Sequence, residues 1–249
     1  MTTSNNNPEP PIYPAPLANL HKPSFTLPPD ATDSHAHVFG ARAQYGYDDA
    51  RQYTPPPVYL KDYLAMHDTV GFARGVVVQS GVHGTNNQVI VDAIAQSNGR
   101  LRGIALLRED ITDAELDALD KAGVCGFRAN LVAKVGVKFE AAKKLAARVA
   151  RLGWHAQFLL DIENFPDLDR IAADFPSEMM IDHMGRPDPT PGRERARLSG
   201  VDSCAAQRAC VVEVISALPH VAHADSLRRS HAFRTSAGCR CAGSAGVRH

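Results

Sequence analysis

Two patterns of apolar and polar positions alternate along the chain between about residue 31 and residue 189. Short, nearly continuous apolar runs predict strands that are buried on both faces of a parallel sheet. The segments between these runs place apolar residues at helical spacing, and several end at a glycine, which closes helices well. The predicted strands span residues 31–38, 74–80, 102–107, 125–131, 154–160 and 179–185. The predicted helices lie within residues 56–71, 86–99, 112–123, 140–153 and 164–176.

Six strands and five helices in strict alternation are typical of the α/β class. A TIM (β/α)8-type barrel is the best single prediction, incomplete in that strands one to six are recognisable and strands seven and eight are not. A doubly wound open sheet is the alternative, but no glycine-rich phosphate loop follows the first predicted strand. Six strands alone cannot close such a barrel, so we expect open apolar edges on the first and sixth strands.

The barrel portion at residues 31–189 is flanked by two segments of different composition. Residues 1–30 form a proline-rich N-terminal tail, which we expect to be either draped over the body or disordered. Residues 190–249 form an atypical C-terminal segment that is rich in Arg, Ser, Ala, Cys and His and contains no Lys. One helical patch at about residues 205–218 is the only regular element that its pattern suggests.

Composition narrows the classes of function. The 249 residues carry 27 Lys and Arg against 27 Asp and Glu, so no overall field favours nucleic acid or an anionic membrane. No apolar run approaches the roughly 18 residues that a membrane-spanning helix needs. The N-terminus lacks the basic and apolar regions of a secretory signal, and the five cysteines do not suggest a disulfide framework. We therefore expect a cytoplasmic protein whose partner is a small molecule, with its oligomeric state left open.

Candidate chemistry begins at the stretch TDSHAHVFG, where His35 and His37 stand two residues apart on the first predicted strand. Residues at this spacing point to the same face of a strand. A third histidine, His183, ends the sixth predicted strand at the same level of the barrel. Imidazoles there can bind a metal ion or hydrogen-bond a substrate carbonyl. The alternative is a set of polar strand-end residues without chemistry.

Six segments together resemble the amidohydrolase-related superfamily (amidohydrolase 2), and most closely its branch of 2-pyrone-4,6-dicarboxylate lactonase-like hydrolases. These segments are DSHAHVFG, GVVVQSGVHGTNNQ, LRGIALL, GVCGFRANL, GWHAQFLL and IDHMGRP. The resemblance covers residues 30–189 and implies a (β/α)8 barrel. It also implies a hydrolase that adds water to the ring ester carbonyl of a small carboxylated lactone. This branch is expected to work without a divalent metal.

The resemblance assigns roles position by position. His35, His37 and His183 would polarise the lactone carbonyl and stabilise the developing oxyanion. Arg128 would bind a substrate carboxylate with its planar fork, although a structural ion pair is the alternative for this arginine. The further substrate-binding candidates are Gln157, Ser80, His83 and Asn87. If a metal, zinc or manganese, is bound after all, His35 and His37 would hold it.

The chain also departs from the family pattern. Strand five lacks the metal-binding histidine, and strand four lacks the metal-bridging lysine, which favours the metal-free branch. An aspartate in a GTDWPH-like motif at strand eight, the base that would activate water, is missing. We therefore expect this chain to be impaired in catalysis. A shifted reading frame near residue 190 is the simplest hypothesis, and a divergent C-terminus is the alternative.

Other functions remain open at this point. Within the same superfamily, the chain could be a sugar-acid lactone hydrolase or isomerase, or a metal-dependent decarboxylase. From a different class, it could be a non-catalytic remnant that associates with an intact barrel. Tightly bound zinc or manganese would favour the decarboxylase, and ligand binding without turnover would favour the remnant.

Overall fold

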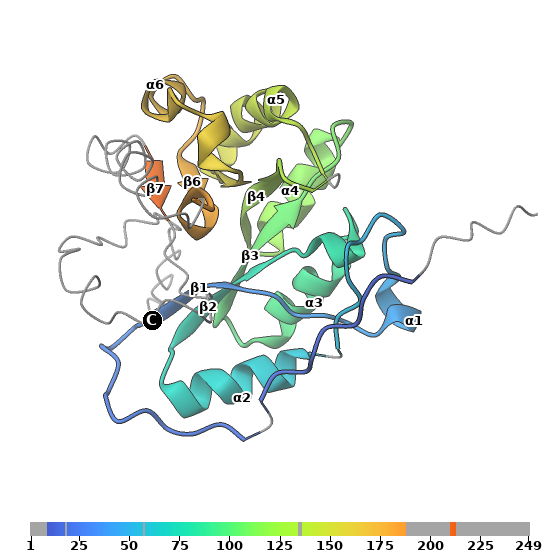
Figure 1. Cartoon of the computed structure of the whole chain (residues 1–249), viewed down its shortest axis with the longest axis vertical. Coiled ribbons are helices and arrows are strands. Elements are labelled where there is room, and N and C mark those ends of the chain that lie inside the picture. The colour runs from blue at the N-terminus through green and yellow to red at the C-terminus, as the bar shows by residue number, and fades with distance from the viewer. Residues whose placement is uncertain (1–8, 18, 57, 134–135, 188–209, 213–249) are drawn as a thin grey trace, which may run out of the picture.

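The computed structural model describes residues 9–17, 19–56, 58–133, 136–187 and 210–212, and in them seven parallel strands form one sheet. The strands follow one another in the sheet in the same order as in the chain (Figure 1). They are β1 (Thr32–Ala36), β2 (Arg74–Val78), β3 (Leu101–Leu106), β4 (Val124–Asn130), β5 (His155–Leu159), β6 (Met179–Ile181) and β7 (Cys210–Val212). The sheet curls as part of a TIM barrel does, so the predicted fold class and the first six strands are confirmed.

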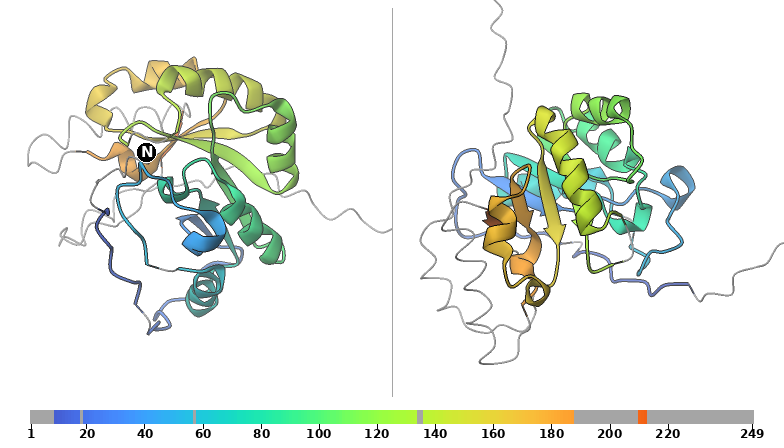
Figure 2. Two further views of the ribbon diagram at one scale, coloured as in Figure 1. Left: turned by 90° about the vertical axis from the view of Figure 1, so that its right-hand side faces the viewer. Right: turned by 90° about the horizontal axis from the view of Figure 1, so that it is seen from above.

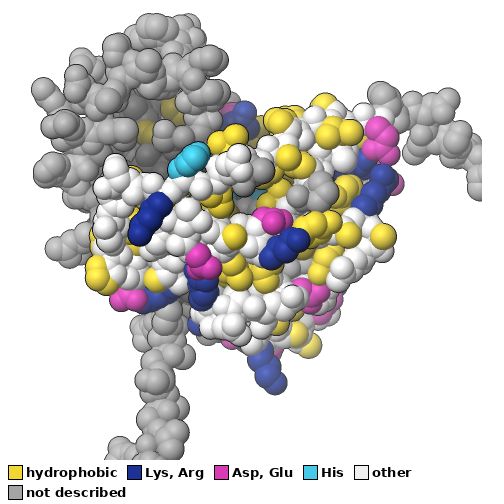
Figure 3. Space-filling model, turned by 90° about the horizontal axis from the view of Figure 1, so that it is seen from below, with side chains coloured by type: hydrophobic (Ala, Val, Ile, Leu, Met, Phe, Trp, Pro, Cys, Tyr) yellow, Lys and Arg dark blue, Asp and Glu magenta, His cyan; other side chains and the backbone are white. Residues whose placement is uncertain are grey.

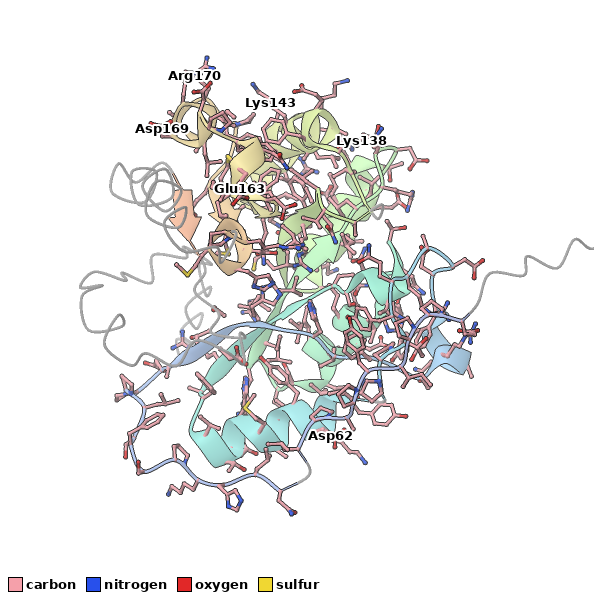
Figure 4. The ribbon with its side chains drawn as sticks, viewed as in Figure 1. Asp62, Lys138, Lys143, Glu163, Asp169 and Arg170 are labelled. Carbon is pink, nitrogen blue, oxygen red and sulfur yellow. The ribbon has the colours of Figure 1, made fainter. Side chains whose placement is uncertain are left out.

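Helices follow the outer side of this curled sheet (Figure 2). They are α1 (Arg42–Tyr45), α2 (Leu60–Val70), α3 (Gln88–Gln96), α4 (Asp113–Lys121), α5 (Phe139–Val149) and α6 (Leu168–Ala173). The five predicted helices are confirmed as α2 to α6, and the short α1 was not predicted. Charged side chains such as Lys143 and Arg170 point away from the sheet (Figure 4). The face seen from below mixes charges of both signs with apolar side chains (Figure 3).

Burial of the apolar runs explains why these residues form strands. Val77, Ile104, Phe127 and Ile181 are fully buried, each in a different strand. The sheet is thus covered by helices on one side and filled by its own side chains on the other, as in a barrel. Among the described residues, no helix is long and apolar enough to cross a membrane.

The C-terminal segment departs from expectation at β7. A helical patch over residues 205–218 is wrong at Cys210–Val212, which form a strand paired in parallel with Met179–Ile181. Two consecutive β-branched valines favour extended backbone, and the edge of β6 offers unpaired backbone groups that a strand satisfies. The predicted open edge of the sixth strand is therefore paired. Within the described residues β1 pairs with β2 alone. Residues 188–209 and 213–249 lie outside the described residues, and with them the reading-frame hypothesis.

A polar cluster surrounds Asp33 near the start of β1, next to the start of β2. The Asp33 carboxylate accepts hydrogen bonds from the Tyr63 hydroxyl at 3.0 Å and from His67 Nε2 at 3.3 Å. Gly75 lies against both rings. A methyl group added there would be 2.5 Å from His67 Cε1 and 2.5 Å from the Tyr63 oxygen. Because Asp33 holds both rings, neither can retreat easily.

We expect Gly75→Ala to lower the free energy of unfolding by about 1–3 kcal/mol, the usual cost of overpacking. Gly103→Ala is the matched control, since it also adds a methyl group to a central strand. Its nearest neighbour is the flexible Cδ1 end of Ile94 at 2.8 Å, which can move at little cost. Urea unfolding of the two variants measures the difference. If both variants lose the same free energy of unfolding, the side chains around Asp33 move aside as easily as the end of Ile94 does, and the expectation is wrong.

Candidate active site

Three histidines meet at the carboxyl end of the sheet. His35 lies in β1, and His37 is the first residue after the end of β1. The centroids of their rings are 5.1 Å apart. The His183 ring lies 5.2 Å from the His35 ring. The structure therefore brings together the three histidines that the sequence singled out. Their catalytic roles remain a proposal.

His183 does not end a strand as expected. β6 stops at Ile181, and His183 lies in the following turn (Asp182–Gly185) with φ 51° and ψ 40°. Met184 and Gly185 share this left-handed conformation, with φ 56° and 72°. Non-glycine residues rarely adopt it, and strained backbone of this kind persists only where the surroundings hold it. Here the turn buries the Asp182 carboxylate while it directs the next residue toward His35.

Asp182 is the centre of the site, and sequence reasoning missed it. Its carboxylate is fully buried. Oδ2 accepts a hydrogen bond from Arg128 Nε at 2.8 Å and lies 2.7 Å from Arg128 Nη2 in an ion pair. Oδ1 accepts a hydrogen bond from Gln157 Nε2 at 2.5 Å. A signal was available, because a carboxylate that directly follows a buried strand lies at the edge where functional groups gather in parallel sheets.

Strand register explains how these groups meet. Arg128 in β4 stands beside Gln157 in β5, and Gln157 stands beside Met180 in β6. Two residues further along, Asp182 leaves the strand and turns back over its neighbours. The predicted substrate-binding residues Arg128 and Gln157 therefore lie in one buried row. Arg128 forms the ion pair that was the alternative to a substrate contact.

Hydrogen bonds assign opposite tautomers to His35 and His37. The Gln157 amide nitrogen can only donate, so His35 Nδ1 accepts at 3.1 Å and the neutral ring carries its proton on Nε2. The Val78 carbonyl can only accept, so His37 Nδ1 donates at 2.7 Å and leaves a lone pair on Nε2. His35 thus presents a donor at Nε2, whereas His37 presents an acceptor.

Burial keeps the rings of His37 and His183 neutral. Burial lowers the pKa of His37 to about 3, and the positive charge of Arg128 and the nearby His35 add to the effect. Burial also lowers the pKa of His183, with Asp182 acting in the opposite direction. At neutral pH both rings act as neutral hydrogen-bonding groups rather than as cations.

The remaining candidates lie further out. Ser80 follows β2 and its Oγ is 3.2 Å from the hydroxyl oxygen of Tyr53, a residue that the sequence analysis did not consider. His83 Nδ1 donates to the Gly46 carbonyl at 2.8 Å, and its ring packs among Phe39, Tyr45 and Tyr47. The Asn87 amide exchanges two hydrogen bonds with the Leu106 backbone, at 2.8 and 2.9 Å. Asn87 therefore fixes the end of β3, and the buried Ser80 hydroxyl also accepts from the Val82 N–H at 3.3 Å.

The described residues do not form a ready metal centre. Among them, no group of three or more His, Cys, Asp or Glu is arranged to hold a metal ion. The Nδ1 atoms of His35 and His37 are turned toward Gln157 and Val78, so only the Nε2 atoms could serve as ligands. Two imidazoles fall short of the three protein ligands that are usual for catalytic zinc.

Two buried histidines predict how stability depends on pH. Burial lowers the pKa of His37 to about 3 and that of His155 to about 4, from the ordinary value of 6.5. At a pH between the lowered pKa and 6.5, each histidine is protonated in the unfolded chain and neutral in the folded one. The free energy of unfolding therefore falls as the pH drops below 6.5. At about pH 5 the loss should be roughly 1–2 kcal/mol for each ring.

Denaturant unfolding at several pH values measures this slope. His155→Gln should reduce the slope of the free energy of unfolding against pH by the amount that corresponds to about one bound proton. His21→Gln, at an exposed position of the N-terminal tail, is the matched control and should leave it unchanged. A slope that is the same in wild type and His155→Gln would contradict the expectation.

The chain is similar in sequence to known hydrolases. Residues 32–232 match the family model described as Amidohydrolase, so the match extends past residue 190, where the sequence analysis expected no family motif. The chain is 41% identical over 178 residues to 2-pyrone-4,6-dicarboxylate hydrolase of Comamonas testosteroni, covering 70% of this chain and 58% of that protein. It is 32% identical over 181 residues to 4-sulfomuconolactone hydrolase of Hydrogenophaga intermedia, covering 71% and 59%. The chain thus spans less than two thirds of the length of these relatives.

Solved structures agree with the fold. A putative 2-pyrone-4,6-dicarboxylic acid hydrolase from Pseudomonas putida superposes with a TM-score of 0.62 at 30% identity, over 76% of this chain and 69% of that one. An amidohydrolase from Burkholderia multivorans with bound zinc gives a TM-score of 0.52 at 18% identity, over 73% and 68%. At that identity the second similarity concerns the fold alone.

Proposed function

Because this chain belongs to the amidohydrolase family, we propose that it acts on a small lactone that carries carboxylate groups. Water would add to the ring ester carbonyl, and cleavage of the ring C–O bond would release a new carboxylate and a hydroxyl group. The single observation that carries the proposal is the cluster of His35, His37 and His183 beside the buried Arg128–Asp182 ion pair. It places imidazole hydrogen-bonding groups that could meet a carbonyl oxygen next to a buried arginine within one site.

The tautomers divide the work between the histidines. His35 would donate from Nε2 to the carbonyl oxygen, which becomes the oxyanion when water adds. His37 cannot donate from Nε2 while its Nδ1 proton is bonded to Val78, so it would accept a hydrogen bond from the attacking water. This refines the expectation that both rings stabilise the oxyanion. With its pKa near 3, His37 orients water rather than removing its proton efficiently.

Arg128 would contribute one edge of its guanidinium to substrate binding. Its Nε and Nη2 already bond Asp182, so a substrate carboxylate would meet Nη1 rather than the full fork. The ion pair also offsets part of the positive charge. We therefore expect Arg128 to orient a carboxylate group rather than to supply most of the binding free energy.

Metal dependence belongs to the same proposal. We propose a reaction that uses the protein's own donors, because no three His, Cys, Asp or Glu side chains among the described residues are arranged to hold a metal ion. One divalent ion, zinc or manganese, held by His35 and His37 is the alternative, and a zinc-containing structure of the same fold makes it worth testing. Elemental analysis of the purified protein, and activity after chelation, separate the two.

Loss of the pyrone ring absorbance with 2-pyrone-4,6-dicarboxylate tests the function directly. We expect slow ring opening, because the sequence lacks the GTDWPH-like motif that would supply the base. His35→Ala removes the proposed donor and should abolish the residual rate. Lys143→Gln, on the outer surface, is the control that should leave it unchanged. If wild type neither opens the ring of this compound nor binds it, the proposal is refuted. Binding without turnover would favour a non-catalytic remnant.

A further inference from the structure

The N-terminal tail lies across the loop that approaches the site from β1. Residues 9–13 of the tail, called the strap below, contact residues 51–54. The Tyr13 backbone N–H donates to the Thr54 carbonyl at 3.1 Å, and the Thr54 N–H donates to the Pro11 carbonyl at 2.8 Å. Ile12 and Thr54 form an isolated parallel bridge. The strap therefore adds a short piece of extended chain to this loop.

An ion pair fixes the other end of the strap. The Glu9 carboxylate bonds Arg51 and also contacts Arg42 at 3.4 Å. Arg51 is only 7% exposed although it belongs to a loop. A buried arginine needs an anionic partner, and the strap supplies it. Contacts at both ends show that the strap is built into the fold at this place.

An aromatic stack lies at the Tyr13 end of the strap. The Tyr13 and Tyr53 ring centroids are 4.8 Å apart and their planes differ by 10°. The Tyr53 hydroxyl is 3.2 Å from Ser80 Oγ. Tyr53 also meets Phe39 edge-on at 6.3 Å, and Phe39 lies 6.1 Å from the His37 ring. A continuous row of rings thus joins the strap to the histidine cluster.

We propose that Tyr13 is a positioning residue that fixes Tyr53, and through it the Ser80 hydroxyl, beside the histidine cluster. The inference rests on the proposed function, since it assigns this pair of hydroxyls to the wall that a carboxylated lactone passes or contacts. Tyr13 itself is 54% exposed, so it contributes little to the core. Its main contact is the face of Tyr53, and this makes a local effect on the site separable from an effect on folding.

Substitutions at Tyr13 test the role of the ring. Tyr13→Ala removes the stack and should raise KM for 2-pyrone-4,6-dicarboxylate by roughly 2- to 10-fold, the worth of an aromatic pair, with kcat little changed. Tyr13→Phe keeps the ring and should behave as wild type. Phe25→Ala is the matched control, because Phe25 is an aromatic residue of the same tail that is 60% exposed. Thermal unfolding of all three variants checks that the fold is intact.

Two further readouts do not depend on turnover. Binding of benzene-1,3-dicarboxylate, an unreactive ring with two carboxylates in the meta arrangement, should weaken in Tyr13→Ala by the same factor as KM. Trypsin should cleave after Arg51 faster in Tyr13→Ala and in Glu9→Gln than in wild type, since a loosened strap exposes Arg51. The exposed Arg170 in α6, which does not contact the strap, provides an internal reference site for the protease.

The outcomes separate this inference from the proposed function. A raised KM or weakened binding in Tyr13→Ala, restored in Tyr13→Phe, supports the positioning role. Faster cleavage after Arg51 with unchanged KM and unchanged binding overturns it, because the strap would then be structural only. If wild type neither turns over nor binds either compound, the proposed function fails. The positioning role fails with it, because a change in cleavage after Arg51 alone would show only a structural strap.

Discussion

Replacing Asp182 with asparagine should lower the free energy of unfolding by about 3 kcal/mol or more. The substitution keeps the shape of the side chain and removes its charge. Arg128 is then left as a buried cation without its counter-ion, because the Asp182 carboxylate accepts from its Nε and pairs with its Nη2. Breaking a buried ion pair on one side is costly for this reason. Urea unfolding at neutral pH gives the measurement.

Two comparisons show whether the buried charge is responsible. Asp117→Asn removes a surface ion pair to Arg151 of similar length, 2.6 Å, in which both side chains are about half exposed, and should cost at most about 1 kcal/mol. Combining Asp182→Leu with Arg128→Met removes both charges and should recover much of the lost stability. If Asp182→Asn and Asp117→Asn cost the same, the buried ion pair is not the important interaction.

Replacing His183 with asparagine should reduce kcat/KM for lactone hydrolysis by about 10²- to 10³-fold, the usual loss when one oxyanion donor is removed. Asparagine tolerates the left-handed backbone of this turn, so the variant removes the ring without forcing the chain to move. Rates of ring opening under matched conditions give the ratio.

Met184→Asn is the control for His183→Asn. Met184 is the next residue and has φ 56°, so both variants place asparagine in the same left-handed turn. Its activity should stay near that of wild type. Equal losses in the two variants would mean that the turn, rather than the imidazole, is needed. Binding of benzene-1,3-dicarboxylate checks that both variants keep the site intact.

The strands of the barrel were predictable because their apolar runs correspond to real burial. Phe127 and Phe158 lie in runs with almost no polar residue, and both are fully buried in the structure. His35 and His37 were also predictable, since a spacing of two on a strand is a local property. β7 was not, because a short run with two valines and an isoleucine nearby fits a helix or a strand equally well until the edge of β6 is known.

Asp182 shows why the rest of the site escaped prediction. Its partners Arg128 and Gln157 are separated from it by 54 and 25 positions, and only the register of three strands brings them together. The left-handed backbone of His183 has no sequence signal comparable to a glycine. The tautomers of His35 and His37 follow from two hydrogen bonds, to Gln157 and to the Val78 carbonyl, that no local pattern encodes.

Because the strands lie in the sheet in the order of synthesis, the protein can grow by adding one strand and helix to an existing edge. His35 and His37 emerge first, but Gln157, which donates a hydrogen bond to His35 Nδ1, comes much later. Gln157 follows His35 by 122 positions. Until β6 docks, Arg128 has no anion beside it and the row of polar groups is unfinished. Completion of the site is therefore a late folding event, and a nascent chain stopped before residue 179 would hold histidines that are not yet prepared for chemistry.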